Sequence, residues 1–342
     1  MKKYLGKLMN SENLTLEEMQ NATNSCLSED ITNTEIAAFL TALRTKGETA
    51  NEIAGIASVI RAHSDMSSIV LDDCMDNCGT GGDQSNSFNI STTTAFVLAG
   101  AGVKVAKHGN RSISSRTGSA DVLEELGVSL TFSKEDTEYL LKQHNISFLF
   151  APHVHENLHP FMKIRQELGL PTIFNLIGPL TNPIQLTSQM LGVYQRDKLI
   201  TIAESLHQLG RKRAIVINGA DEMDEGSLAG ENHLVLLDEG DIIPFTLHPH
   251  EVGLPVYDQK QIEGGNPKEN AAILLSVLNN EPSPYLDTVL FNAALGLYAN
   301  HKVPTIQAGV DVARETIASG KALNKLNKLI EFSNPQSEEV TI

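Results

Sequence analysis

Cysteine and tryptophan are the residues that this sequence most clearly lacks. The 342 residues include no tryptophan and only three cysteines, Cys26, Cys74 and Cys78. A sparse, odd set of thiols does not form the disulfide framework of a small secreted domain, and it favours a reducing cytoplasm. The spacing of Cys74 and Cys78 suggests a metal pair, but no other cysteine completes a thiolate site. We therefore interpret these side chains as buried, reduced thiols.

Long apolar runs and an excess of positive charge are also missing. No segment approaches the roughly 20 apolar residues of a membrane-spanning helix, and residues 1–20 contain no apolar run of signal-peptide length. We therefore expect a cytoplasmic protein with no membrane partner. Lysine and arginine number 26 against 42 acidic residues, a formal net charge of -16. Such a surface repels phosphates and argues against a nucleic-acid partner, but it permits a small anion in a local basic pocket.

The N-terminal residues have the pattern of a helical module. Thr15, Thr32 and Thr49 are each followed three positions later by a glutamate, which is the spacing of a capping box at a helix start. Apolar residues then recur at helical spacing, for example at Ile36, Phe39, Leu40 and Leu43. We predict a compact group of helices in this part of the chain.

From about residue 66, short β-rich runs alternate with helical stretches. Alternation of this kind predicts mainly parallel strands with crossover helices, and hence an α/β fold. We expect a small helical domain at residues 1–65, joined by part of 155–180, and a large α/β domain at 66–342. The candidate strands are 68–73, 103–108, 147–152, 213–219 and 234–238, and the candidate helices include 92–102, 119–127, 197–210 and 266–279.

Three polar stretches follow candidate strands, where ligands bind in open α/β sheets. The first is GTGGD, residues 79–83, whose bare backbone lets a phosphate approach the N–H groups closely. It lacks the lysine of a P-loop and the third glycine of a dinucleotide fingerprint. The second, residues 107–127, is a basic island in an acidic protein. The third, residues 221–225, contains carboxylates that suit Mg²⁺ shared with substrate phosphates.

Two other clusters have simpler interpretations. His153, His155 and His159 resemble zinc ligands, but no regular helical register places them on one face and no cysteine assists. Asp121 and Glu124, with Glu125, could be mistaken for catalytic acids. We interpret them as acidic residues of a helix start that favour the helix dipole.

Six stretches taken together resemble one known family. They are GTGGD, NIST, KHGNR, GSADVLEELG, TIFNLIGPLTNP and MDEGSLAG. In this order they are similar to the anthranilate phosphoribosyltransferases of tryptophan biosynthesis, and the match spans almost the whole chain. The resemblance implies that the amine of anthranilate displaces pyrophosphate from 5-phosphoribosyl 1-pyrophosphate (PRPP), giving N-(5-phosphoribosyl)anthranilate. It also implies two Mg²⁺ per subunit, a homodimer, and a fold shared with pyrimidine nucleoside phosphorylases.

The family's functional residues are carried over position by position. The resemblance implies PRPP ligands at Gly79, Gly82, Asp83, Ser87, Asn89, Ile90, Ser91, Thr92, Lys107 and Ser119. It implies anthranilate ligands at Gly79, His108, Asn110, Arg165, Gly178 and Pro179. It implies metal ligands at Ser91, Asp224 and Glu225, and it places Lys107, His108, Asn110 and Arg165 nearest to the chemistry.

Some points of this assignment stay open at the level of the sequence. The acidic stretch contains a second pair, Asp221 and Glu222, which would hold the metal if the alignment were shifted. His108 is either a general base or part of the pocket wall. The chain departs from the family at Asn218, where a histidine is usual, and in the segment 155–165. A nucleoside phosphorylase of the same fold is the nearest alternative function, and a nucleic-acid-binding relative is a more distant one.

Overall fold

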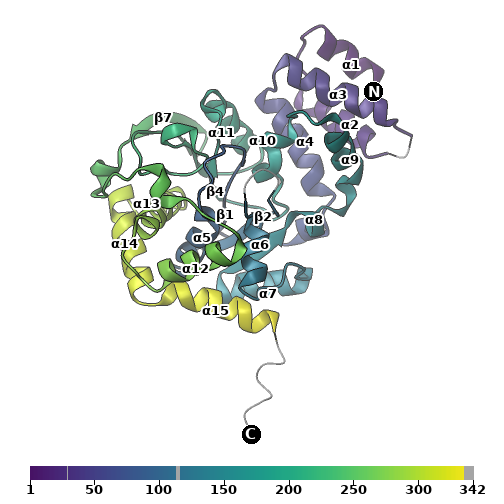
Figure 1. Cartoon of the computed structure of the whole chain (residues 1–342). Helices are drawn as coiled ribbons and strands as arrows, with labels where there is room; N and C mark the ends of the chain where they lie inside the picture. Colours follow the sequence, from purple (N-terminus) through teal and green to yellow (C-terminus); the bar gives the residue numbers. More distant parts are fainter. Residues whose placement is uncertain (29, 113–115, 335–342) are drawn as a thin grey trace.

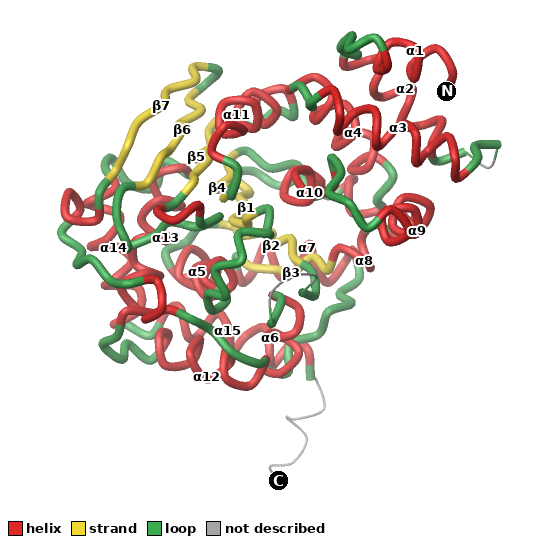
Figure 2. Tube along the Cα trace, turned by 45° about the horizontal axis from the view of Figure 1, so that its top comes forward, coloured by secondary structure: helices red, strands yellow, loops and turns green. Residues whose placement is uncertain are grey.

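The helical module lies at one end of the molecule (Figure 1). The computed structural model describes residues 1–28, 30–112 and 116–334. The module begins with four helices: α1 (Lys2–Met9), α2 (Leu16–Cys26), α3 (Asn33–Lys46) and α4 (Ala50–Ala62). A later segment adds α9 (His159–Leu168) and α10 (Phe174–Ile177), whereas α8 (Ala151–Val154) before them packs against β3 (Ile146–Phe150) of the sheet. In both views α9 lies beside α3, far from it in sequence (Figure 2).

The predicted helix starts and apolar stripes are confirmed. Glu18 N donates to Thr15 Oγ1 and Thr15 N donates to Glu18 Oε2, both at 3.2 Å, and the same box forms at Thr32. Each such cap stabilises a helix by about 1 kcal/mol. The predicted stripe from Ile36 to Leu43 is fully buried, in a core that also contains Phe161 and Phe174 of the later segment. The two helical segments therefore pack as one body.

A seven-stranded sheet forms the centre of the rest of the chain. Its strands are β1 (Cys74–Gly79), β2 (Lys104–Gly109), β3 (Ile146–Phe150), β4 (Ser188–Gly192), β5 (Arg213–Asn218), β6 (Asn232–Asp238) and β7 (Asp241–Leu247). Their order is β3-β2-β1-β4-β5-β6-β7. The first five are parallel, whereas β6 and β7 are antiparallel, so the predicted mainly parallel α/β fold is confirmed.

Helices cover both faces of this sheet. They are α5 (Ile90–Gly100), α6 (Ser119–Glu125), α7 (Lys134–His144), α11 (Leu199–Gln208), α12 (Pro267–Leu278), α13 (Pro284–Ala299), α14 (Ile306–Ala318) and α15 (Lys321–Ser333). Both α5 and α13 are buried on nearly every side because they pack against each other as well as the sheet. On the opposite face α11 packs between the sheet and α4 (Figure 2). This contact joins the helical module to the sheet.

One predicted strand is wrong, and three strands were not predicted. Residues 68–73 form the end of a 3-10 turn and a loop, in which Val70 is 69% exposed and Asp73 has a left-handed φ of 56°. The run looked β-like, and Ile69 and Leu71 are buried on either side of exposed Val70, but the segment pairs with no strand of the sheet among the described residues. The missed β1 and β4 are short and polar, and β7 carries Pro244 at the sheet edge. Their strand conformation depends on their neighbours rather than on local propensity.

Candidate active site

A cavity opens at the carboxyl ends of β1 and β2 and is closed on one side by the loop after β5. The cavity brings the glycine-rich, basic and acidic stretches together. Gly79 and Glu225, which both line it, are 146 positions apart in the sequence (225 minus 79). The predicted residues that line it are Gly79, Gly82, Asp83, Ser87, Asn89, Ile90, Ser91, Thr92, Lys107, His108, Asn110, Ser119, Asp224 and Glu225. Arg165, Gly178 and Pro179 do not line it.

The acidic loop presents the buried Asp224 and the partly buried Glu225 carboxylates to this cavity. Gly81 N donates to Asp224 Oδ2 at 2.6 Å, and Asp224 N donates to Asp83 Oδ2 at 3.3 Å. Burial and the neighbouring charges of Asp83 and Glu225 raise the pKa of Asp224 well above its usual range. Burial likewise raises the pKa of Glu225 to about 7, although Lys107 opposes the shift. Crowded, poorly solvated carboxylates of this kind favour a bound cation.

The other acidic pair points elsewhere. Asp221 and Glu222 are exposed, lie outside the cavity, and have left-handed φ angles of 59° and 60°. The structure therefore places the pair chosen by the alignment, and not this one, against the glycine-rich loop.

Three glycines at strand ends make room for the acidic loop. A Cβ at Gly79 would overlap the Asp224 carboxylate, and one at Gly192 would overlap the Asp224 carbonyl oxygen. A Cβ at Gly219 would overlap the carbonyl oxygen of Glu225. Sequence reasoning missed Gly192 and Gly219. The available signal was a single glycine at the end of each strand, which often marks a close backbone approach.

Lys107 brings a positive charge beneath the cavity floor. Its side chain is buried, and Nζ donates to the carbonyl oxygens of Asn77 at 2.7 Å and His108 at 3.4 Å. It lies close enough to Glu225 to work against the raised pKa of that carboxyl. A buried ammonium held by carbonyl oxygens is well placed to attract a further anion.

His108 and His155 form a buried pair of rings, 5.3 Å apart and edge to face. The ring of His108 donates to the carbonyl of Gly178 and that of His155 to Thr181. Both Nε2 atoms are buried without a hydrogen-bond partner among the described residues. Burial lowers the pKa of His155 to about 4 and that of His108 well below its usual value. His108 is therefore neutral at pH 7.

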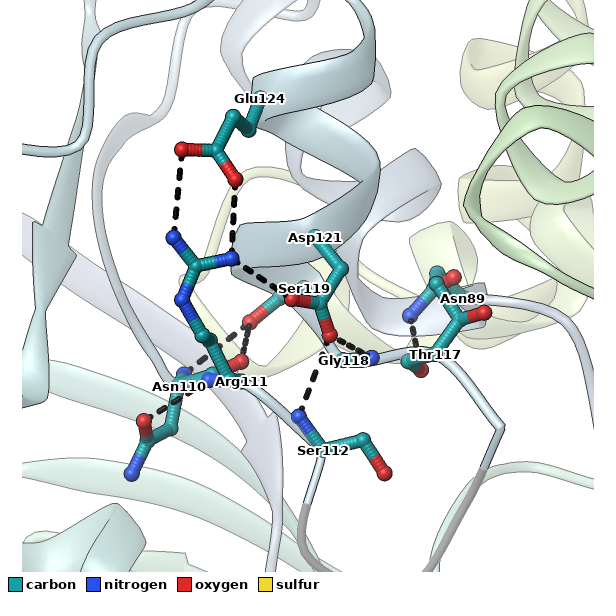
Figure 3. Close-up of polar contacts among 9 residues, drawn as sticks. All are labelled: Asn89, Asn110, Arg111, Ser112, Thr117, Gly118, Ser119, Asp121 and Glu124. Carbon is teal, nitrogen blue, oxygen red and sulfur yellow. Dashed lines mark hydrogen bonds and ion pairs between the residues drawn. The ribbon is translucent and has the colours of Figure 1, made fainter.

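The basic stretch folds back on itself next to the cavity (Figure 3). Asn110 N donates to Ser119 Oγ, and Ser119 Oγ donates to the carbonyl of Asn110, both at 3.2 Å. Asn89 Nδ2, at the start of α5, donates to the carbonyl of Thr117 at 3.1 Å. Residues 113–115 of this stretch lie outside the described part of the chain. These bonds hold Asn110 and Ser119 side by side at the cavity wall.

Comparison with known proteins identifies the family. The model of the glycosyl transferase family, helical bundle domain, matches residues 2–64, and that of the a/b domain matches residues 71–323. An anthranilate phosphoribosyltransferase of Listeria monocytogenes serotype 4a is 57% identical over 97% of this chain and 98% of the relative. The chain belongs to the anthranilate phosphoribosyltransferase family. This decides against the nucleoside phosphorylase alternative, and the activity is that of the family, in tryptophan biosynthesis.

Solved anthranilate phosphoribosyltransferases share the whole fold. The structure from Thermus thermophilus is 38% identical with a TM-score of 0.90, covering 97% of this chain and 99% of that chain. A Saccharomyces cerevisiae structure in complex with PRPP and Mg is 29% identical with a TM-score of 0.88, covering 97% of both chains. Another, in complex with 4-fluoroanthranilate, is 28% identical with a TM-score of 0.87 and the same coverage.

Three residues that the family resemblance assigns to anthranilate lie outside the cavity lining. The Arg165 guanidinium on α9 stacks over the Phe174 ring at 5.1 Å. Burial lowers its pKa, and no carboxylate of the described residues lies within ion-pair distance. Gly178 is bound to the His108 ring, and the carbonyl of Pro179 accepts from Gln189 Nε2 at 2.7 Å. The wall next to His108 is therefore continuous with the segment that supports Arg165.

Two sequence features have structural roles in this member of the family. Asn218 replaces the usual histidine, and its Nδ2 donates to the carbonyls of Val193 and Tyr194 at 2.9 and 3.1 Å. It thereby holds the chain that leaves β4.

No group of three or more metal-ligating side chains of the His, Cys, Asp and Glu type is found in the described ranges. His155 packs against His108, whereas His153 Nε2 contacts the Phe132 carbonyl at 3.3 Å.

Proposed function

We propose that the cavity binds PRPP together with Mg²⁺, and that anthranilate enters from the side of His108 to attack it. The reaction transfers the 5-phosphoribosyl group to the amine of anthranilate and releases pyrophosphate. The observation that supports this most strongly is the meeting of glycine amides, the Lys107 ammonium and the Asp224–Glu225 pair around one cavity. This set of groups complements a metal-bound diphosphate.

PRPP is held by groups from three loops in this proposal. Gly79 and Gly82 line the cavity with bare backbone, and Gly82 has a left-handed φ of 88° that favours glycine. The 11-residue helix α5 points its N-terminus at the cavity, and the buried Thr92 Oγ1 has no partner among the described residues. The remaining proposed ligands are Asp83, Ser87, Asn89, Ile90, Ser91, Lys107 and Ser119.

We assign two Mg²⁺ per subunit to the acidic side of the cavity. Glu225 accepts a hydrogen bond from Ser91, so this pair would hold one ion, and Asp224 with Glu225 would hold the second. Carboxylate and hydroxyl oxygens of this kind fit Mg²⁺. Burial and the neighbouring carboxylates raise the pKa values of Asp224 and Glu225, and a bound cation would stabilise their ionised forms. Bound magnesium would offset the charge that develops on the departing pyrophosphate.

The proposed reaction does not require a general base near the nucleophile. The amine of anthranilate is neutral at pH 7, so no strong base is needed to create a nucleophile. The lowered pKa of His108 makes it a weak base, and its Nε2 is buried, so we assign this ring to the pocket wall. Catalysis therefore depends on positioning and on leaving-group electrostatics.

Arg165 and Asn110 are the proposed hydrogen-bond donors to anthranilate, with Gly79, His108, Gly178 and Pro179 forming the wall. Arg165 is half-buried without an anionic partner in the described ranges, so an incoming carboxylate would satisfy it. Its planar fork can bind both carboxylate oxygens.

Arg165→Ala is expected to raise the KM for anthranilate at least about tenfold while changing the KM for PRPP much less, because a lost charge-assisted pair costs about 1.5–3 kcal/mol. Loss of anthranilate fluorescence, with each substrate varied in turn, measures both constants. Lys163→Ala is the matched control, since Lys163 is an exposed cation on the same helix. Equal effects on the two KM values would reject the assignment.

Magnesium alone is expected to raise the melting temperature more at pH 8 than at pH 6. The folded-state pKa of Glu225, about 7, lies above the unfolded value of about 4.3. The contribution of Glu225 to stability is therefore present at low pH and is lost as the pH rises through 7. Above this pH, bound Mg²⁺ would stabilise the folded state by binding the ionised carboxylate. Thermal unfolding with and without Mg²⁺ measures the difference. Glu225→Gln should reduce the pH dependence, since Asp224 is then the only proposed metal carboxylate left to titrate, and a pH-independent gain in the wild type would contradict the metal site.

Four further assignments remain proposals for this chain. We propose a homodimer, since Met9 and Leu170 of the helical module expose 79% and 64% of their surface. We propose a cytoplasmic location and no nucleic-acid partner, on the charge and cysteine content given above. Among the described helices, none has the length and apolar character needed to cross a membrane. The division into domains 1–65, with part of 155–180, and 66–342 also stays a prediction.

A further inference from the structure

Asp121 makes more contacts than its place at a helix start requires (Figure 3). Its Oδ2 accepts from the backbone N–H of Gly118 at 2.8 Å and from that of Ser112 at 3.3 Å. Its Oδ1 accepts from Arg111 Nη1 at 2.9 Å. The N–H of Gly118 belongs to the helix start, but Ser112 and Arg111 belong to the other side of the loop. One carboxylate therefore ties the two sides of this loop together.

The backbone crossing beneath Asp121 is tight. A Cβ at Gly118 would overlap Ser112 N and the carbonyl oxygen of Asn110. Ala120 N also donates to that carbonyl oxygen at 3.2 Å. The position of Asn110 thus depends on how closely residues 110–112 are held against residues 118–120.

The side-chain amide of Asn110 is oriented by the same residues. Its Oδ1 accepts from Arg111 N at 2.7 Å, and its Nδ2 points away from the loop in the close-up (Figure 3). No described residue is recorded as a hydrogen-bond partner of this Nδ2, and Asn110 lines the cavity. The donor that would meet anthranilate is therefore set in place by the backbone next to Arg111.

Asp121 is better suited to this task than Glu124, the other carboxylate that binds Arg111. The Glu124 side chain is 57% exposed and that of Arg111 is 46% exposed, so their ion pair contributes little to the stability of the loop. The Asp121 side chain is 19% exposed and binds backbone N–H groups that cannot move away. Burial works to raise the pKa of Asp121, but the Gly118 N–H, the Arg111 guanidinium and the Ser112 N–H together lower it. The ionised form is the one that holds the loop.

We propose that Asp121 is a positioning residue that fixes the Asn110 amide for anthranilate, without touching either substrate. This inference rests on the proposed role of Asn110. It differs from a role in folding alone, because the effect of Asp121 on anthranilate should pass through Asn110. It also differs from the helix-dipole role suggested by the sequence, because a dipole contact would not depend on Ser112.

The test compares Asp121→Ala, Asp121→Asn and the matched control Glu125→Ala, an exposed carboxylate on the same helix. Asp121→Ala should raise the KM for anthranilate on the order of tenfold, the equivalent of about one charge-assisted hydrogen bond. Asp121→Asn retains an oxygen for the two backbone N–H groups and should stay within about threefold of the wild type. Glu125→Ala should match the wild type. If Asp121→Ala does not fold, Asp121→Ser replaces it, since a hydroxyl cannot reach both N–H groups.

A double-mutant cycle decides between the explanations. With Asn110→Ala already present, Asp121→Ala should raise the KM for anthranilate no further, since coupled residues give non-additive effects. Additive effects, or a wild-type KM for Asp121→Ala, would overturn the role of Asp121. A wild-type KM for Asn110→Ala alone would instead overturn the proposed role of Asn110, so the two failures are distinguishable.

Discussion

Glu225→Gln is expected to lower kcat by at least about 100-fold, the loss typical when an electrostatic contact to a developing charge is removed. In the proposed site this carboxylate serves both magnesium ions and also receives the Ser91 hydrogen bond. The glutamine keeps the shape but removes the anionic charge on which cation binding depends. Initial rates measured across a magnesium titration test this expectation. Asp224→Asn should lose less activity and should need more Mg²⁺ to reach its maximum.

The controls for this prediction come from the same loop. Asp221→Asn and Glu222→Gln remove equal charge from exposed side chains that lie outside the cavity. Both should retain nearly wild-type rates and magnesium requirements. If they lost activity while Glu225→Gln kept it, the alignment of the acidic stretch would be wrong.

Gly192→Ala is expected to damage the same site without altering any charged group. Gly192 pairs with Gly79 across β1 and β4, and its carbonyl accepts from Thr80 N at 2.9 Å. A Cβ there would occupy the position of the Asp224 carbonyl oxygen, and its nearest contacts are all backbone atoms of Asp224, so no flexible side-chain end can move aside. Forced overpacking of this kind typically costs about 1–3 kcal/mol. We expect a lower melting temperature and at least about a 100-fold loss of kcat as Asp224 and Glu225 are displaced.

Gly6→Ala is the control for the added methyl group. Gly6 lies within α1 with no atom within 4 Å of the added Cβ, so alanine should leave activity unchanged. It should also stabilise the helix slightly, by up to about 1 kcal/mol. A Gly192→Ala enzyme with the wild-type magnesium requirement would show that the acidic loop does not depend on this close approach.

Features that depend on local spacing could be predicted well from the sequence. The capping boxes at Thr15 and Thr32 and the stripe from Ile36 to Leu43 form as expected, because their partners lie within one or two helical turns. The strand at 68–73 was predicted wrongly, and β1 and β4 were missed. Strand formation depends on neighbouring strands that are distant in sequence. Local pattern is therefore a weaker guide to this sheet than to the helices.

In the candidate site too, residue types could be recognised from the sequence, whereas their arrangement in space could not. The glycine, basic and acidic stretches could be recognised by residue type. Their meeting point, and the choice of Asp224 over Asp221, depend on where the loop after β5 lies against the glycine-rich loop. Gly192 stands at the end of β4, a strand that was not predicted, so its glycine could not be recognised as the end of a strand. Its role appears only when the backbone of Asp224 is seen against it.

The sequence by itself determined the family, the mainly parallel α/β architecture and the set of chemical groups that the protein can use. These follow from residue types, their order and their short-range periodicity. Only the tertiary structure decided which carboxylates face the cavity, which histidines are neutral and how Asp121 ties the loop that carries Asn110. Burial and close approach arise between segments far apart in the chain, and they change the pKa and the orientation of a side chain without changing its identity.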